Sequence, residues 1–318
     1  MKSVFHSRWA DEMSKFLAFR RAYLTTTWPA AQLRRFDSFA AAHPRLSLRE
    51  AVSAWIRADP DRHPLTRSND LAAVRQFCLY RKRFEPDGFV PEQMLPVTAV
   101  RRHFQACILT PQQIRLLLRS IPELDGPPLR RARMRALFLV LYCTGLRLGE
   151  ALRLCIADVD LKQGCFRIGP SKGRTRLVPF GRDLAHELDH WLAARRDSGF
   201  ALSPQTPLFE REDGRPDNLW NAGMRLNTLF RHCGLKPPRG SGRVGLRVHD
   251  LRHTFAVHRL QAWYREGQDP GPLLPWLSAY LGHVNLLGTQ RYLRATPEIL
   301  REASSRMRRG IGFKPGEP

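Results

Sequence analysis

Six residues in the second half of the chain are of types that can act together on a phosphodiester. They occur in the order Arg147, Lys172, His249, Arg252, His283 and Tyr292. A planar guanidinium holds phosphate oxygens through paired hydrogen bonds and stays charged at any relevant pH. Lysine and histidine can transfer protons, and tyrosine can attack phosphorus. Because cationic side chains can stabilise the developing charge directly, this set predicts phosphodiester chemistry without a metal or other cofactor.

Each of the six lies in a short motif. The first arginine is in T-G-L-R-L-G-E and the lysine in S-K-G-R-T-R-L-V-P. The first histidine and second arginine share H-D-L-R-H-T-F-A, and the second histidine is in L-G-H, upstream of the tyrosine in T-Q-R-Y. A single arginine in an arginine-rich chain is usually a solvated surface residue, and a single histidine is more often packed than catalytic. The joint order and the motifs favour a shared site.

Two local arrangements would place these side chains usefully. Arg147 follows a Thr-Gly helix stop and opens the next helix, where free backbone N–H groups also favour an anion. Arg252 lies three positions after His249, so a helix would put both on one face. Glu150 lies three positions after Arg147. We therefore predict that Glu150 orients an arginine of the site.

The first part of the chain predicts a small helical bundle. Apolar residues recur at helical spacing over 12–23 and 29–42, and an S-x-x-E capping box opens a third helix over 47–58. A fourth helix is predicted to begin at Ser68. The stretch 84–110 contains three prolines, one glycine and no helical period, which is typical of a linker.

The second part predicts helices around one antiparallel hairpin. Thr110 before a proline is a typical helix start, and the apolar stretch 130–142 reads as a buried helix. The strands are expected at 166–169 and 176–180, and further helices at 149–154, 248–264, 271–281, 289–294 and 297–307. The predicted fold class is therefore mainly α with a small antiparallel β-sheet.

Composition indicates a polyanionic partner. The 318 residues carry a formal net charge of +23, with a pI of about 11.0, and the excess is spread over both halves. Nucleic acid is the first candidate, although an arginine-rich chain with solvated faces would show the same surplus. No apolar run approaches the roughly 20 residues that a membrane helix needs. The six cysteines form no C-x-x-C pair, which favours buried thiols in a reducing cytoplasm.

Taken together, the motifs resemble the tyrosine site-specific recombinases of the phage integrase family. The resemblance covers roughly residues 110–297 and extends more weakly to the N-terminal helices. It implies a SAM-like DNA core-binding domain over 1–100, a linker over 101–110 and a catalytic domain over 111–318. It also implies an exchange helix over 297–307 that docks on a neighbouring subunit.

The resemblance assigns a role to each of the six residues. Tyr292 would be the nucleophile that forms a 3′-phosphotyrosyl link, and Lys172 the general acid for the 5′-hydroxyl. His249 would assist proton transfer at the tyrosine, and His283 would hydrogen-bond the phosphate. The two residues that would bind the scissile phosphate are Arg147 and Arg252.

The same resemblance implies the partners. These are double-stranded DNA with inverted-repeat core sites and a tetramer of the chain itself or with a paralogous recombinase, without ATP or a cofactor. The reaction would pass through a Holliday junction, in transposition or integration of a mobile element or in dimer resolution. The basic residues expected to contact DNA lie beside the hairpin lysine and in a Gly-rich loop, which could equally be a solvated loop; they are Arg174, Arg176, Arg239, Arg243 and Arg247.

Three other classes of protein share part of this pattern. A type IB topoisomerase uses the same chemistry, but the two-domain layout and the helix after Tyr292 favour a recombinase. A non-catalytic basic DNA-binding protein would have no reason to place a tyrosine after L-G-H and H-x-x-R. A metal phosphohydrolase built on His249 and Asp250 would need further His or Asp ligands.

Overall fold

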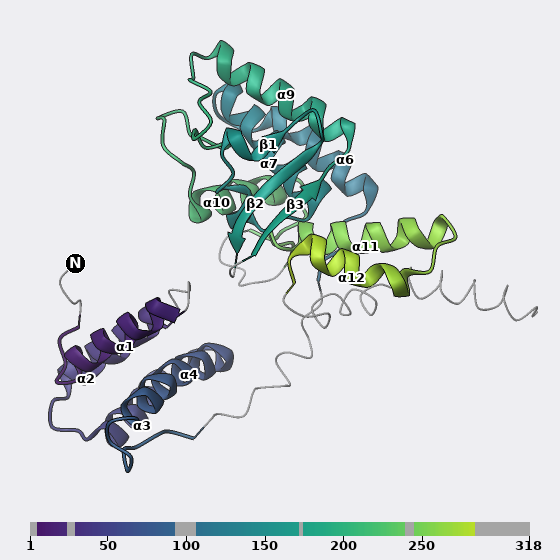
Figure 1. Cartoon of the computed structure of the whole chain (residues 1–318). Helices are drawn as coiled ribbons and strands as arrows, with labels where there is room; N and C mark the ends of the chain where they lie inside the picture. Colours follow the sequence, from purple (N-terminus) through teal and green to yellow (C-terminus); the bar gives the residue numbers. More distant parts are fainter. Residues whose placement is uncertain (1–4, 24–28, 93–105, 172–173, 239–244, 284–318) are drawn as a thin grey trace, which may run out of the picture. The chain divides into compact units, whose positions relative to one another are not determined.

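The computed structural model describes residues 5–23, 29–92, 106–171, 174–238 and 245–283 (Figure 1). The chain divides into two compact units, Met1–Phe104 and Gln105–Pro318, which are described separately. The predicted helices at 289–294 and 297–307, and residues 93–105 of the predicted linker, lie outside the described residues. Within the described ranges, no helix is both long and apolar enough to cross a membrane.

The described residues of the N-terminal unit form the helices α1 (Ala10–Tyr23), α2 (Ala30–Ala42), α3 (Leu48–Arg57) and α4 (Pro64–Arg81). Their apolar faces bury one aromatic-rich core. The predicted capping box is present, since Ser47 Oγ accepts from the Glu50 N–H at 3.3 Å and the Glu50 carboxylate accepts from the Ser47 N–H at 2.8 Å. These local signals fixed the helix start correctly.

The start of α4 differs from the prediction. The helix begins four residues before Ser68, and Ser68 lies inside it. Pro64 occupies the first helical position, where its missing N–H costs nothing, and the His63 ring accepts from the Leu65 N–H at 3.2 Å. The helix therefore starts at the proline, and Ser68 does not act as its N-cap.

The C-terminal unit surrounds a three-stranded sheet with helices (Figure 1). Before the sheet come α6 (Pro111–Ser120), η1 (Ile121–Glu123), α7 (Pro128–Thr144), α8 (Leu148–Ala151) and η2 (Ile156–Asp158). The strands are β1 (Val159–Asp160), β2 (Cys165–Ser171) and β3 (Arg174–Pro179), and the helices after them are α9 (Arg182–Asp197), α10 (Leu219–His232), α11 (Asp250–Arg265) and α12 (Pro270–Leu281). The mainly α class with a small antiparallel sheet is confirmed.

The sheet order is β1-β2-β3, and both pairings are antiparallel. The predicted hairpin is β2–β3, and β1 was not predicted. Phe166 pairs with Val178 and Ile168 pairs with Arg176. Phe166, Ile168 and Val178 are buried, so the register turns Arg176 toward the protein interior, because alternate residues share one face of a strand.

Helix α7 forms the centre of this unit and packs against both α9 and α11. Phe138 and Val140 are fully buried, as the apolar sequence predicted. The helix stops at Gly145, whose φ of 62° lies in the left-handed region. A Cβ at this position would lie 2.6 Å from Phe255 Cδ1, so glycine is required both by conformation and by the close approach of α11.

Candidate active site

The turn after α7 presents Arg147, which is the N-cap residue of α8. Its side chain is 35% exposed. The helix that follows has a single turn, Leu148–Ala151, and is shorter than the predicted 149–154. After Ala151 the Arg153 and Leu154 N–H groups bond three residues back, at 3.2 Å each, and the Leu154 carbonyl accepts from the Leu208 N–H at 2.7 Å. Arg147 thus stands at a sharp break in the chain, as its sequence context predicted.

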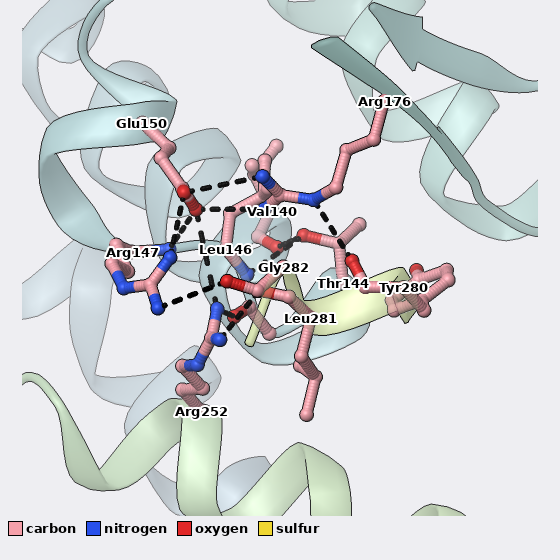
Figure 2. A network of polar contacts seen from close by, with 11 residues as sticks. Val140, Thr144, Leu146, Arg147, Glu150, Arg176, Arg252, Tyr280, Leu281 and Gly282 are labelled. Carbon is pink, nitrogen blue, oxygen red and sulfur yellow. Dashed lines mark hydrogen bonds and ion pairs between the residues drawn. The ribbon is translucent and has the colours of Figure 1, made fainter. Parts of the chain in front are cut away.

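Glu150 is the centre of a polar network (Figure 2). Its side chain is 1% exposed. It accepts from the Arg147 backbone N–H at 3.0 Å and from Arg147 Nη1 at 2.9 Å. It also accepts from Arg176 Nη1 at 3.3 Å and Nη2 at 2.9 Å. The structure therefore shows the predicted contact between Glu150 and Arg147, together with a second arginine that was not expected there.

The pKa of Glu150 follows from this environment. Burial by itself raises the pKa of a carboxyl group. The hydrogen bond from Arg176, the Arg147 N–H and the charges of both arginines outweigh that effect and lower the pKa of Glu150 to about 2. Glu150 is therefore an anion at neutral pH and holds both guanidinium groups by charge-assisted hydrogen bonds.

Arg252 enters the same network from α11. Its side chain is 2% exposed, and its Nη1 lies 4.0 Å from Glu150 Oε2. Nη1 donates to the Gly145 carbonyl at 2.8 Å and Nη2 donates to the Leu281 carbonyl at 2.5 Å. Two arginines that lie far apart in the sequence are thus brought to one carboxylate, as a phosphate-binding pair would require.

The end of α12 is bound by arginines at three successive carbonyls (Figure 2). The Tyr280 carbonyl accepts from Arg176 Nε at 2.9 Å. The Leu281 carbonyl accepts from Arg252, and the Gly282 carbonyl accepts from Arg147 Nη2 at 3.4 Å. Carbonyls at a helix C-terminus lack partners within the helix and carry partial negative charge, so cations stabilise them. The next residue is His283.

Both predicted histidines lie beside this network. Burial lowers the pKa of His249, and the charges of Arg252 and Arg147 lower it further. The same causes, in the same order, lower the pKa of His283 to about 4. Both imidazoles are therefore neutral at pH 7, and a neutral imidazole can accept a proton at one nitrogen while donating a hydrogen bond from the other. His249 lies at the N-cap of α11, one residue before the helix proper.

The remaining predicted residues are placed as follows. Lys172, Tyr292, Arg239 and Arg243 lie outside the described residues. Arg174 is the first residue of β3. The Arg247 guanidinium donates to the Asp250 carboxylate through Nη2 at 2.6 Å and Nε at 3.1 Å. No group of three or more His, Cys, Asp or Glu within the described ranges is arranged to hold a metal ion.

Arg176 is the residue whose surroundings differ most from the prediction. We expected a DNA contact, but its side chain is only 14% exposed and all three of its nitrogens donate within the protein. The sequence did contain a signal for this. Once Phe166 and Ile168 define the buried face of β2, an antiparallel register places Arg176 on that face and Leu177, 62% exposed, on the other.

Comparison with known proteins gives one family. Residues 108–298 match the model of the phage integrase family. The protein y4rB of Sinorhizobium fredii, provisionally named an integrase/recombinase, is 34% identical over 269 residues, which cover 82% of this chain and 83% of that protein. The tyrosine recombinase XerD of Mycobacterium leprae is 31% identical over 270 residues, covering 80% of this chain and 78% of XerD.

The fold is similar to that of solved recombinases. One is the Tn1549 transposon integrase, whose structure was determined in complex with circular intermediate DNA. It superposes with a TM-score of 0.64 over 93% of this chain and 99% of the solved chain, at 17% sequence identity. At that identity the likeness concerns the fold.

Proposed function

We propose a nucleophile for this chain, which belongs to the phage integrase family and is a site-specific DNA recombinase that cleaves and rejoins DNA strands. That nucleophile is Tyr292. In the proposed step, the Tyr292 oxygen attacks the scissile phosphorus and the bond from phosphorus to the 5′ oxygen breaks. The products are a 3′-phosphotyrosyl link and a free 5′-hydroxyl. Because the covalent link preserves the phosphodiester energy, the reverse attack rejoins the strand without ATP.

The observation that carries this proposal is the charge of the arginine network. Three guanidinium groups surround one buried carboxylate, Glu150, so these four side chains together carry two positive units. A phosphodiester brings one negative charge, and a second develops as the nucleophile attacks. Fixed positive groups stabilise that added charge most strongly in a site from which water is excluded. Arg147 and Arg252 are the members that we assign to the phosphate.

Proton transfer is assigned to the remaining residues. The tyrosine hydroxyl must lose its proton, which it does not do readily since its ordinary pKa is near 10. His249 is neutral at pH 7, because burial and then two arginines lower its pKa, and it is therefore able to accept that proton. We assign Lys172 to protonation of the leaving 5′ oxygen, and His283 to a hydrogen bond with the phosphate.

A nicked suicide substrate tests the proposal. Loss of a short strand after cleavage prevents rejoining, so the wild-type protein should accumulate as a covalent DNA adduct that survives denaturant. Adduct should form equally in EDTA. The variant Tyr292→Phe should form none while binding the half-site with unchanged affinity, because only one oxygen is removed. Adduct formation by Tyr292→Phe, or a strict requirement for Mg²⁺, would contradict the assignment.

The assembly that we propose is a tetramer on inverted-repeat core sites, in which residues 297–307 of one protomer dock on the next. An apolar groove of about 380 Å³ between α11, α12 and the end of β3 supports this proposal. It is lined by Phe255, Trp263, Leu277 and Tyr280, and by Trp276, which is 74% exposed. Residues 297–307 contain Ile299, Leu300 and Met307. The amphipathic helix predicted over these residues is a suitable occupant, and contacts of this head-to-tail type can close into a ring.

Truncation after Ala295 tests the docking. A docked helix predicts that the truncated chain still binds a half-site as a single protomer but no longer assembles cooperatively on a full site. A truncated protein that is insoluble, or that binds no half-site, would show that the segment belongs to its own core. We further propose that Arg174, Arg239, Arg243 and Arg247 contact the DNA backbone, and that the reaction takes place in the cytoplasm on nucleoid DNA.

A further inference from the structure

We infer that Arg176 is a positioning residue for DNA cleavage: it neutralises Glu150 and fixes the end of α12, so that the other two arginines can act on the phosphate. The inference rests on the proposed function, because it concerns the same site. It departs from the expectation that Arg176 contacts DNA. Three features of the structure support it, namely the bonding of the guanidinium, the charge balance of the network and the packing at Gly282.

The guanidinium of Arg176 joins three separate parts of the fold. The residue itself lies in β3, two of its nitrogens bind Glu150 in α8, and Nε binds the Tyr280 carbonyl at the end of α12 (Figure 2). A second contact between the same strand and helix reinforces the joint, since the Tyr280 hydroxyl donates to the Pro179 carbonyl at 2.9 Å. A planar fork with five donors can span such a set of acceptors, whereas a lysine ammonium cannot hold the same geometry.

The charge balance gives Arg176 a specific effect. Glu150 holds Arg147 through hydrogen bonds from the N–H and the guanidinium of that arginine, but the negative charge of the carboxylate opposes the binding of a phosphate nearby. The bidentate bond from Arg176 offsets that charge with one positive unit. Without Arg176, the network of Arg147, Arg252 and Glu150 would carry one positive unit instead of two. The electrostatic stabilisation of the reacting phosphate would therefore fall even though both phosphate-binding arginines are still present.

The packing at Gly282 ties Arg176 to the segment that leads to His283. Gly282 has a φ of 66°, and a Cβ built there would lie 2.7 Å from Arg176 Nη1 and 2.9 Å from Cζ. The guanidinium thus lies directly against the Gly282 backbone. His283 follows immediately, and its N–H donates to the Ser278 carbonyl at 3.0 Å. Movement of Arg176 would therefore move the end of α12 and His283 with it.

The variant Arg176→Gln tests the inference, with single-turnover cleavage of the nicked substrate and half-site affinity measured on the full chain. A positioning role predicts cleavage about 10- to 100-fold slower, equivalent to about 1.4 to 2.7 kcal/mol in the barrier, with half-site affinity within about twofold of wild type. The matched control is Arg167→Gln. Arg167 lies in the same hairpin but is exposed, and its variant should cleave at close to the wild-type rate.

The double variant Glu150→Gln/Arg176→Gln separates positioning from a purely structural role. It removes one charge of each sign and restores two positive units to the network, so it should cleave at least severalfold faster than Arg176→Gln alone. Arg176→Lys keeps the charge but cannot span all three acceptors, and it should recover only part of the rate. These comparisons use the adduct formed per correctly folded molecule, so partial unfolding of one variant does not obscure them.

Two results would overturn the inference. If Arg176→Gln weakens half-site binding in parallel with cleavage, and the second substitution restores nothing, Arg176 contacts DNA as the sequence suggested. If Arg176→Gln cleaves like wild type, the residue has no role in the reaction. A wild-type chain that forms no Tyr292-dependent adduct would instead refute the proposed function, so the two failures can be distinguished.

Discussion

Two buried arginines of the C-terminal unit, Arg195 and Arg252, lie in clusters with different charge balance. At one, Arg195 is 1% exposed and donates to Glu210 at 2.5 Å and to the carbonyls of Pro207 and Leu208 at 2.9 and 3.2 Å. At the other, Arg252 is equally buried and also donates to two carbonyls. The first arginine has one carboxylate to itself, whereas the second shares Glu150 with two other arginines. Both side chains are almost fully buried and both donate to two backbone carbonyls, but Arg195 also donates directly to its carboxylate, whereas Arg252 lies 4.0 Å from Glu150. The two clusters therefore differ in how the carboxylate is shared and in the surplus of charge.

We propose that this difference separates a structural cluster from a reactive one. A balanced buried pair stabilises the fold, and because its two charges cancel it attracts a charged ligand only weakly. A cluster with surplus positive charge is less stable by itself, because like charges repel, and it gains most when an anion arrives. The surplus positive charge also affects His249 and His283, because Arg252 and Arg147 contribute to the lowered pKa of both.

The largest expected effect is the contrast between Arg252→Ala and Arg195→Ala. Arg252→Ala should slow cleavage by on the order of 10³-fold or more, because transition-state charge loses a direct partner. Arg195→Ala should instead lower the free energy of unfolding by about 3 kcal/mol, because it removes a buried cation from Glu210, whose side chain is only 12% exposed. Urea unfolding and single-turnover cleavage, measured on both variants, give the two quantities.

The comparison fails if the two variants behave alike. Arg252→Ala will also lose some stability, since the Gly145 and Leu281 carbonyls lose a donor. Cleavage is therefore normalised to the folded fraction. If Arg195→Ala, once folded, cleaves as poorly as Arg252→Ala, the charge surplus does not distinguish the clusters.

A smaller effect is expected from Arg147→Lys. The lysine keeps the positive charge, but a point charge cannot bind Glu150 and a phosphate through paired hydrogen bonds as a guanidinium can. We expect cleavage about 100-fold below wild type, equivalent to about 2.7 kcal/mol in the barrier, with near-normal half-site binding. Arg167, exposed in the hairpin, gives the control, and Arg167→Lys should cleave at close to the wild-type rate. Near-normal cleavage by Arg147→Lys would mean that this arginine provides charge alone.

The sequence predicted those parts of the fold that local chemistry decides. The capping box at Ser47, the N-cap at Thr110, the helix stop at Gly145 and the β2–β3 hairpin all depend on residues a few positions apart. The contact between Glu150 and Arg147 was predictable for the same reason, since three positions span one helical turn.

The environment of Arg176 depends on contacts that local pattern does not contain. Tyr280 is 104 positions away in the sequence, and the bond to its carbonyl exists only once β3 and α12 pack together. The sequence suggested a DNA contact for Arg176 because the residue is positively charged and lies near Lys172. That prediction did not take into account how β3 pairs with β2. Register decides which face of β3 is buried, and a shift of one residue would have reversed it.

A more modest difference in cleavage is expected between alanine variants of Gly282 and Gly234. Both have left-handed backbone, with φ of 66° and 68°, but a Cβ at Gly234 meets nothing within 4 Å while one at Gly282 meets Arg176. Each alanine variant should lose roughly 1–2 kcal/mol of stability from the backbone alone. Only Gly282→Ala should also slow cleavage, by about tenfold, because it displaces Arg176. Equal cleavage by both variants would show that the contact with Arg176 does not matter for the reaction.

The smallest effect is the titration of His283, which reports the charge surplus without any change in the fold. Burial, and then the charges of Arg252 and Arg147, lower its pKa to about 4 in the free protein, whereas an unfolded histidine titrates near 6.5. The unfolded chain therefore binds more protons between these values. Stability from this group is complete above about pH 6.5 and is lost as the pH falls toward 4.

NMR of the His283 imidazole, assigned with His283→Gln, should show the low titration midpoint in the free protein. The midpoint should shift upward in Arg147→Ala and further upward on half-site DNA, because a bound phosphate offsets the arginine charges. A His283 midpoint that stays the same in the free protein, the Arg147→Ala variant and the DNA complex would mean that burial alone sets it. The arginine cluster would then exert no more field on its surroundings than the balanced Arg195 pair.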